Sequence, residues 1–226
     1  NGRYDEAEAT FLEITRLTPN NPRGYALLGT TYQLTGSYER AAEMYERSLT
    51  IEPTTAAINN LGALYCNMGR YKDAARAFEE AVRMGVNRHT VWGNLGDAYR
   101  YTETDSKTTT EAYEKAVGLA EALLEVNPND ARTRGCLATY LSKLGAHTRA
   151  IQEIERSVQL APNDVDILYY RIVVYELAGN RDEALQAFQE GLKAGISLNE
   201  LETNPDLAGL REDDRFDATV RSNKQS

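Results

Sequence analysis

The chain has 226 residues, of which 42% are hydrophobic and 26% are charged, an ordinary composition for a folded protein in water. Its formal net charge is -9 and no cluster of lysine and arginine stands out, so we expect neither nucleic acid nor an anionic membrane among its partners. No segment has the roughly 18 consecutive apolar residues that a membrane-spanning helix needs, and the first residues lack the apolar core of a signal peptide. We therefore expect a cytoplasmic protein.

The first predicted element is a helix over residues 4–17, in which Ala7, Phe11 and Ile14 share one face. It has the pattern of a second helix in a helical hairpin, and no first helix precedes it. We interpret residues 1–21 as a half repeat. This indicates either a fragment of a longer protein or a helix through which two copies associate as a homo-oligomer.

Two patterns then recur along the chain. The first is a small residue followed three positions later by a large one, with a turn glycine after it, as in Gly29, Tyr32 and Gly36. The second is Ala, an aromatic or large apolar residue four later and a small residue three after that, as in Ala41/Tyr45/Ser48. Prolines follow four of the second helices, where they cannot continue a helix: Pro19, Pro53, Pro128 and Pro162. The patterns predict five helical hairpins over residues 22–54, 55–88, 89–130, 131–164 and 165–195.

These recurrences resemble the tetratricopeptide repeat family, whose unit is a helix-turn-helix of about 34 residues. The segment from Trp92 to Tyr99, WGNLGDAY, is similar to the family consensus for a first helix. The resemblance implies an all-α fold, a right-handed α-solenoid of antiparallel helix-turn-helix repeats. The small residues permit close helix approach and the aromatic residues fill the space beside them, so we assign both to the core.

The third repeat departs from this pattern, because its second-helix motif arrives eight residues late after the polar segment 101–110. Thr108 and Glu111 have the spacing of a capping box, which predicts a helix from Thr109 to Val126. The segment is either a tolerated insertion or a projecting contact surface.

The fifth repeat carries Arg171 where other first helices carry leucine. A charge there needs a partner, so we expect this hairpin to be partly open to solvent, or the side chain to reach the surface. Short apolar pairs in residues 196–220 predict capping turns over the end of the stack, and we expect residues 221–226 to be disordered.

No catalytic constellation is recognisable, so we expect a protein that is not an enzyme and that uses no metal or cofactor. His89 and His147 are far apart and have no metal-ligand spacing, and no phosphate-binding or nucleophile motif occurs. Cys66 and Cys136 lie in helical patterns 70 residues apart, which favours two buried or half-buried thiols in a reducing compartment.

The family resemblance also implies a binding surface, because first helices of such repeats line a concave groove. Carried over residue by residue, this surface comprises Asn59, Asn60, Asn67, Asn94, Asp97, Arg100, Tyr101, Arg132, Thr139 and Lys143. Asn60 and Asn94 match the asparagine that bonds the ligand backbone in peptide-binding members. The basic residues favour a peptide or protein partner with acidic or carboxylate groups. The first repeat departs from chaperone-binding members, because it has Ala26 and Thr30 where they carry lysine and asparagine.

We therefore expect a protein-protein interaction scaffold. The alternative is a regulatory or self-association segment of a larger protein, because the stretched hairpin and the ending resemble carboxy-terminal repeat regions of bacterial signalling proteins. Those regions are joined to Ser/Thr kinase, adenylate cyclase or winged-helix modules.

Overall fold

The computed structural model describes residues 2–102 and 105–223, and its regular structure is helical. No strand occurs within these two ranges, which confirms the all-α fold class of helix-turn-helix units. The chain divides into two compact units, an N-terminal unit ending at Ala112 and a C-terminal unit beginning at Tyr113. Each unit is described by itself.

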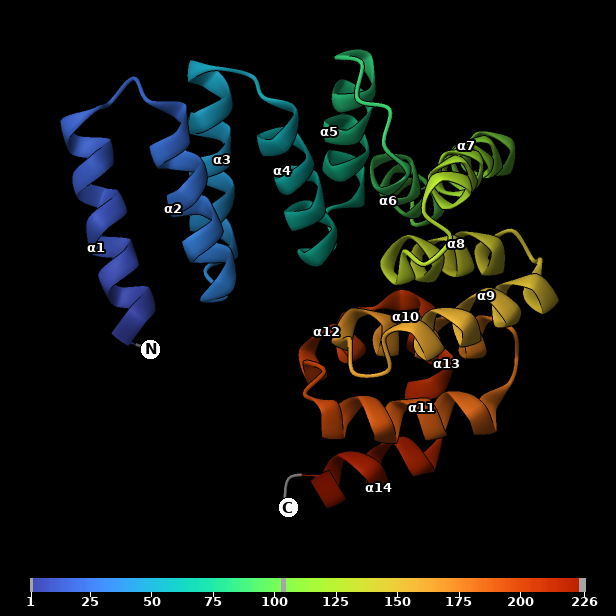
Figure 1. The fold of residues 1–226 in the computed structure, drawn as a ribbon. Coiled ribbons are helices and arrows are strands. Elements are labelled where there is room, and N and C mark those ends of the chain that lie inside the picture. Colours follow the sequence, from blue (N-terminus) through green and yellow to red (C-terminus); the bar gives the residue numbers. More distant parts are fainter. Residues whose placement is uncertain (1, 103–104, 224–226) are drawn as a thin grey trace. The chain divides into compact units, whose positions relative to one another are not determined.

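The N-terminal unit is a row of helical hairpins (Figure 1). The hairpins α2/α3 and α4/α5 are each closed by a short turn, and each neighbouring pair of helices in the row from α1 to α6 is packed together. The helices are α1 (Gly2–Leu17), α2 (Pro22–Leu34), α3 (Tyr38–Ile51), α4 (Thr55–Asn67), α5 (Tyr71–Arg83), α6 (His89–Arg100) and the beginning of α7 (Ser106–Val126).

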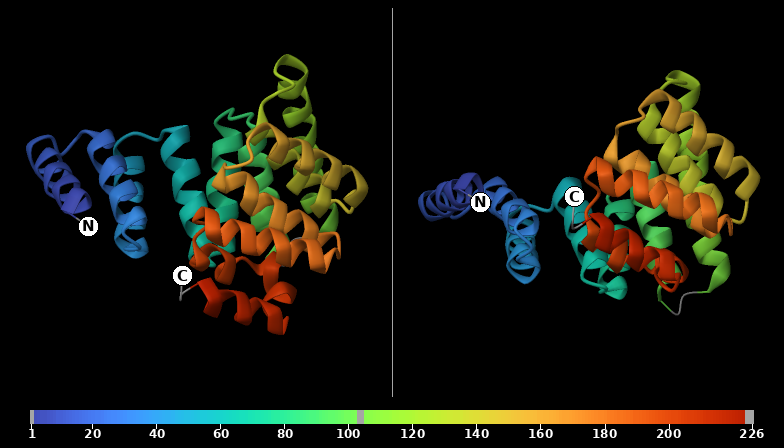
Figure 2. Two further views of the ribbon diagram at one scale, coloured as in Figure 1. Left: turned by 60° about the horizontal axis from the view of Figure 1, so that its bottom comes forward. Right: turned by 90° about the horizontal axis from the view of Figure 1, so that it is seen from below.

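The C-terminal unit contains two complete hairpins, α8/α9 and α10/α11, in which α10 packs against α8, α9 and α11. Short elements follow, and α14 lies along α11 (Figure 2). These helices are α8 (Ala131–Lys143), α9 (His147–Leu160), α10 (Val165–Leu177), α11 (Arg181–Ala194), α12 (Leu198–Thr203), the 3-10 helix η1 (Pro205–Leu207), α13 (Ala208–Arg211) and α14 (Asp214–Asn223). Because α14 reaches Asn223, a helix extends into the segment 221–226 that we expected to be disordered. Residues 224–226 lie outside the described residues.

The predicted turn glycines do adopt the left-handed conformation that favours glycine. Gly36 has φ +76°, its N–H bonds to the carbonyl of Gln33, and the next N–H, of Ser37, bonds back to Tyr32. This pair of hydrogen bonds satisfies carbonyls that the end of α2 would otherwise leave without partners. The same positive φ occurs at Gly69, Gly145 and Gly179.

The hairpins are fixed by helix starts and stops that the sequence encodes. The side chains of Asn21, Thr54, Asp130 and Asp164 accept hydrogen bonds from the first backbone N–H groups of α2, α4, α8 and α10. The second helices α1, α3, α7 and α9 each end two residues before a proline. These signals confine each helix to one repeat.

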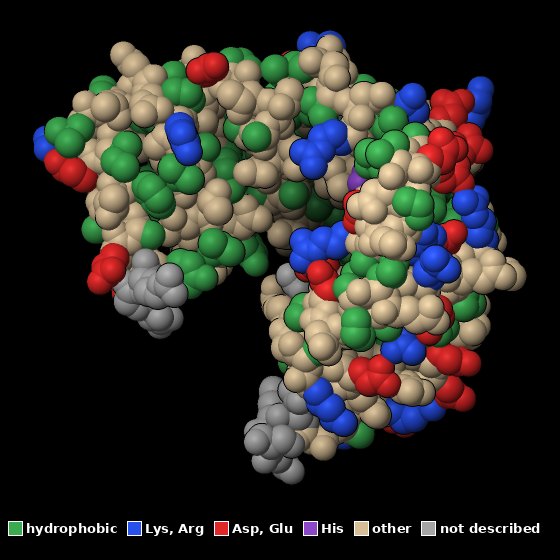
Figure 3. Space-filling model, in the orientation of Figure 1, with side chains coloured by type: hydrophobic (Ala, Val, Ile, Leu, Met, Phe, Trp, Pro, Cys, Tyr) green, Lys and Arg blue, Asp and Glu red, His purple; other side chains and the backbone are tan. Residues whose placement is uncertain are grey.

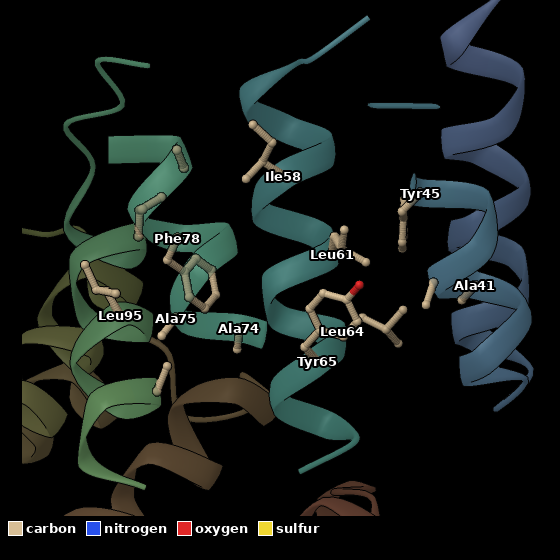
Figure 4. Close-up of a cluster of buried hydrophobic side chains, with 14 of the residues drawn as sticks. Ala41, Tyr45, Ile58, Leu61, Leu64, Tyr65, Ala74, Ala75, Phe78 and Leu95 are labelled. Carbon is tan, nitrogen blue, oxygen red and sulfur yellow. The ribbon is translucent and has the colours of Figure 1, made fainter. Parts of the chain in front are cut away.

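The core of the N-terminal unit consists of alanine, aliphatic and aromatic side chains from α2 to α6 (Figure 4). Phe78 on α5 is fully buried against Gly62 on α4, where an added Cβ would lie 2.7 Å from the Phe78 ring. Tyr45 on α3 faces Gly29 on α2 in the same way, at 3.0 Å. The small residue of the first helix therefore makes room for the aromatic ring of the second.

The third repeat begins its second helix earlier than predicted. Helix α7 starts at Ser106, and Asp105 is its cap: Oδ1 of Asp105 accepts from the Thr108 N–H at 2.9 Å and Oδ2 from the Thr108 hydroxyl at 2.7 Å. Thr108 is thus a donor within the first turn, and the predicted capping box with Glu111 is wrong. Residues 103–104 of the polar segment lie outside the described residues.

Arg171 is half-buried and paired, which corrects the expectation of an open hairpin. Its guanidinium reaches carboxylates that are themselves partly exposed. Its side chain is 17% exposed, with Nε 3.0 Å from Oε1 of Glu155 on α9 and Nη1 2.7 Å from Oε2 of Glu190 on α11. The two carboxylates compensate the charge, so the arginine joins three helices.

Candidate functional site

The predicted surface divides between the two units. Asn59, Asn60, Asn67, Asn94, Asp97, Arg100 and Tyr101 belong to the N-terminal unit, whereas Arg132, Thr139 and Lys143 belong to the C-terminal unit. Each set is carried by first helices, namely α4 and α6 in the first case and α8 in the second.

Asn60 takes part in a polar network that joins α4 to the preceding hairpin. Its side chain hydrogen-bonds Tyr45, whose hydroxyl also lies 3.0 Å from Oγ1 of Thr30 and donates to Oε1 of Gln33 at 3.1 Å. Burial raises the pKa of Tyr45. Asn60 therefore has a structural role in addition to any contact with a partner.

Asn59, one residue earlier on α4, is different. Its side chain is half-buried, and its Oδ1 atom is buried without a hydrogen-bond partner among the described residues. On α6, the Nε1 donor of Trp92 is also buried without a hydrogen-bond partner among the described residues. Helices α4 and α6 are in contact, and each of them holds one such unsatisfied polar atom.

The remaining residues of the N-terminal set follow these helices toward their C-terminal ends. Asn67 and Arg100 are exposed, whereas Asn94 and Asp97 are half-buried. The Tyr101 ring lies 4.8 Å from the Tyr71 ring, centroid to centroid, so this tyrosine packs against the start of α5.

In the C-terminal unit the predicted residues are engaged by their own chain. Nε of the exposed Arg132 bonds Oδ2 of Asp164 at 3.0 Å, and its Nη2 lies 2.9 Å from Oδ2 of Asp166. Thr139 is buried and donates to the carbonyl of Cys136 at 2.7 Å.

Lys143 is also buried, with its side chain 8% exposed and its Nζ 3.5 Å from Oδ2 of Asp206. The expectation that Thr139 and Lys143 line an open surface is therefore corrected. The physical reason is that other residues of the same unit, among them Asp206, pack over this part of α8.

Sequence reasoning missed several polar residues of this unit. Arg134 is buried, donates to Glu153 and to the carbonyl of Pro128 at 2.6 Å, and thereby ties the end of α7 to α8 and α9. Tyr169 accepts a hydrogen bond from the Asn204 amide, and Asp206 pairs with Lys143, and no local pattern reveals these long-range contacts.

Cys66 on α4 and Cys136 on α8 are free and half-buried. Burial raises the pKa of Cys136, so its nucleophilic thiolate is disfavoured. In the part of the chain that the structure describes, no group of three or more His, Cys, Asp or Glu is placed to hold a metal ion. None of the described helices is both long and apolar enough to cross a membrane.

The exposed apolar residues of α1 do not form a single patch. Leu12 and Leu17 are 45% and 63% exposed, but five residues are about 1.4 helical turns, so they lie on different sides of the helix. On the face shown in Figure 3, hydrophobic side chains are spread over the N-terminal helices with few charges among them, whereas acidic and basic side chains alternate over the C-terminal helices.

Comparison with known families identifies the repeat. Family models described as "Tetratricopeptide repeat" match residues 22–55 and 54–86, and a further one matches residues 110–165 and 137–198, together well over half of the chain.

The chain also matches curated proteins over part of their length. The chain is 26% identical over 144 residues to Protein O-mannosyl-transferase TMTC1 of Homo sapiens, covering 62% of this chain and 15% of that protein. It is 21% identical over 183 residues to Anaphase-promoting complex subunit 3 of Schizosaccharomyces pombe, covering 80% and 26%. It is 30% identical over 130 residues to ER membrane protein complex subunit 2-A of Xenopus laevis, covering 57% and 41%. The chain thus spans less than half the length of these relatives.

Solved structures show the same fold. A tetratricopeptide repeat protein from Parabacteroides merdae superimposes with a TM-score of 0.62 at 18% identity, covering 99% of this chain and 87% of that one. A chain of the Cut9-Hcn1 hetero-tetramer of APC/C gives a TM-score of 0.64 at 15% identity, covering 98% and 40%. A thermophilic protein of the same kind from Thermus thermophilus gives 0.61 at 20% identity, covering 82% and 98%.

Proposed function

Because the chain belongs to the tetratricopeptide repeat family, whose fold serves as a scaffold for protein-protein interaction, we propose that it binds a partner protein. The binding site is the face of the N-terminal unit formed by α4 and α6, and the ligand is a peptide segment of the partner. We assign the chain no catalytic role. We propose this binding for the N-terminal unit alone, and we do not assign the activities of the longer relatives to this chain.

The observation that carries the proposal is the pair of unsatisfied polar atoms on α4 and α6. A buried acceptor or donor without a partner costs about 1–3 kcal/mol, which is why such atoms are rare in folded proteins. Each peptide unit of a ligand offers one N–H and one C=O. A peptide N–H and C=O match the Asn59 amide oxygen and the Trp92 indole N–H in kind. Both atoms are covered by the chain itself, so a peptide that bonds them has to displace the side chains that cover them.

The rest of this face supports a partner with acidic groups. Arg100 is exposed at the end of α6 and Asn67 at the end of α4. Arginine binds carboxylates in a bidentate manner, so an acidic side chain or a carboxy terminus suits this end of the face. Arg132 and Lys143 belong to the C-terminal unit, where they are paired with carboxylates of their own chain.

The test begins with selection of binders to the whole chain from a display library of short peptides. Affinities of the selected peptides are then measured by fluorescence anisotropy for wild type, Asn59→Ala, Asn94→Ala and Arg100→Ala. We expect each variant to weaken binding by about tenfold, equivalent to about 1.4 kcal/mol. Lys72→Ala, an exposed charge on the second helix α5, serves as the control and should leave affinity unchanged.

Unchanged affinity in all three variants would remove the α4/α6 face as the binding site. Asn60→Ala is unsuitable for this purpose, because its loss also alters the hydrogen bonds of Tyr45.

A further inference from the structure

Two residues of the C-terminal unit occupy the repeat positions that form the proposed site in the N-terminal unit. Lys143 follows the small residue of its helix by five positions, as Asn67 does on α4. Tyr169 precedes the equivalent position of α10 by three, as Asn59 does on α4. By register, Lys143 and Tyr169 therefore mark the corresponding face of α8 and α10.

This face is already occupied by residues 204–207 of the same chain. The Asn204 amide donates to the Tyr169 hydroxyl at 2.6 Å, and the Asp206 carboxylate lies 3.5 Å from Nζ of Lys143. Leu207 is fully buried in the core formed with α10 and α11. The segment thus places an amide, a carboxylate and an aliphatic side chain on the unit, the three kinds of contact expected of a bound peptide.

The turn is held in shape by its own neighbours. Nη1 of Arg211 donates to the carbonyls of Leu201 and Asn204, at 3.1 and 2.7 Å, and the Asn204 side chain accepts from the N–H of Asp206 at 2.9 Å. Pro205 begins η1 with its fixed φ. A turn ordered in advance loses little entropy when it docks.

The buried ion pair makes the face selective. The side chains of Lys143 and Asp206 are 8% and 3% exposed, and the Lys143 ammonium also lies 5.7 Å from the centre of the Tyr113 ring. A buried pair adds little net stability because desolvation opposes its attraction, but removing one partner strands the other charge. The present occupant of this face brings a carboxylate to Lys143.

We propose that the face of α8 and α10 is a recognition site for an acidic turn of the form Asn-Pro-Asp-Leu, and that residues 204–207 fill it as an intramolecular ligand. The proposal rests on the proposed function in one respect, the use of first-helix faces for recognition. It implies that external partners meet an open face in the N-terminal unit and a closed one in the C-terminal unit.

The test uses a fluorescent peptide of residues 201–212 and the whole chain. The peptide should not bind wild type, because the site is filled. Asp206→Arg repels Lys143 and should release the segment, so the peptide should bind this variant at least tenfold more tightly. The double variant Lys143→Glu/Asp206→Arg restores an attractive pair within the chain and should lose peptide binding again. A peptide carrying Asp206→Arg is the matched control and should bind neither wild type nor the single variant.

Absence of peptide binding to a folded Asp206→Arg chain would overturn the proposal, as would equal binding to the single and double variants. If Asp206→Arg does not fold, hydrogen exchange is measured on the Lys143→Met variant instead. We expect amides of residues 204–211 to exchange at least tenfold faster while those of α8 stay protected, and unchanged exchange would refute the intramolecular ligand. The probe is the chain's own segment, so these outcomes are independent of whether a peptide binds α4 and α6.

Discussion

Close contact between a glycine and an aromatic ring sets the distance between the helices of a hairpin. At Gly62 an added Cβ would lie 2.7 and 2.8 Å from two ring carbons of the fully buried Phe78, closer than atoms can pack. Gly118 on α7 offers a comparison within the same chain, because an added Cβ there meets nothing within 4 Å.

We predict opposite effects of the same substitution at these two glycines. Gly62→Ala should lower the free energy of unfolding by about 1–3 kcal/mol through overpacking. Gly118→Ala should raise it by about 0.5–1 kcal/mol, because alanine is the better helix former. Urea unfolding of both variants measures the difference, and a neutral Gly62→Ala would show that the ring is free to move aside.

A second residue-level feature is the hydrogen bond between a first-helix tyrosine and a glutamate of the preceding second helix. Tyr65 donates to Oε1 of Glu46 at 2.6 Å, and the same bond recurs from Tyr99 to Glu79 and from Tyr175 to Glu155. Burial, together with the nearby carboxylate, raises the pKa of Tyr65 from 10.0 to about 12.

This pKa shift predicts loss of stability at alkaline pH. The unfolded chain releases the Tyr65 proton near pH 10, whereas the folded chain retains it to about pH 12, so the contribution is complete below pH 10 and is lost between these values. Unfolding free energy measured across this range should fall, and Tyr65→Phe should make the fall shallower. The exposed Tyr4→Phe is the control; an identical pH profile for wild type and Tyr65→Phe would contradict the assignment.

Among the elements, α7 is the most unusual, with 21 residues against 12 to 14 in α2 to α6 and α8 to α11. Its start depends on Asp105, which accepts both the N–H and the hydroxyl of Thr108. Its end is tied by Arg134, which donates to the carbonyl of Pro128. Both ends of the helix are therefore fixed by side chains that the repeat pattern does not contain.

Asp105→Ala should destabilise the protein by about 1 kcal/mol, the usual contribution of an N-cap. Glu111→Gln should change stability by less than about 0.5 kcal/mol, because Glu111 is a surface residue whose ion pair with Lys107 is exposed. Thermal unfolding of the two variants separates these expectations. If Glu111→Gln costs more than Asp105→Ala, the capping box between Thr108 and Glu111 governs the start of the helix after all.

The helices were predictable because their signals are local, whereas the polar contacts of the site were not. Turn glycines and prolines mark the hairpins within a few residues, and the structure has them at the helix ends. The capping side chains were not predicted, apart from the capping box at Thr108 and Glu111, which was wrong. Arg171 shows the limit. An arginine at this position indicated that a partner of opposite charge was needed. The partners, Glu155 and Glu190, come from two other helices, and only the packing of those helices brings them to the guanidinium.

The same limit applies to the binding residues. The repeat register placed Asn59 and Lys143 on equivalent helix faces, but it gave no sign that Asp206 covers one of them. Lys143 and Asp206 are 63 positions apart, and their contact depends on how the elements that follow α11 fold back. A periodic pattern does not predict such a contact.

At the scale of the whole molecule, two units with separate cores have unequal surfaces for a partner. The face of α4 and α6 retains unsatisfied polar atoms, whereas that of α8 and α10 is satisfied by the chain itself. The two units are thus similar in fold, but they differ in whether the chain itself occupies the face of their first helices.

Hydrogen exchange of the whole chain, measured with and without a selected peptide, distinguishes the two faces. We predict slower exchange in α4 and α6 on addition of the peptide, and unchanged exchange in α8 and α10. Protection confined to α8 and α10, or to the second helices α3 and α5, would contradict this prediction.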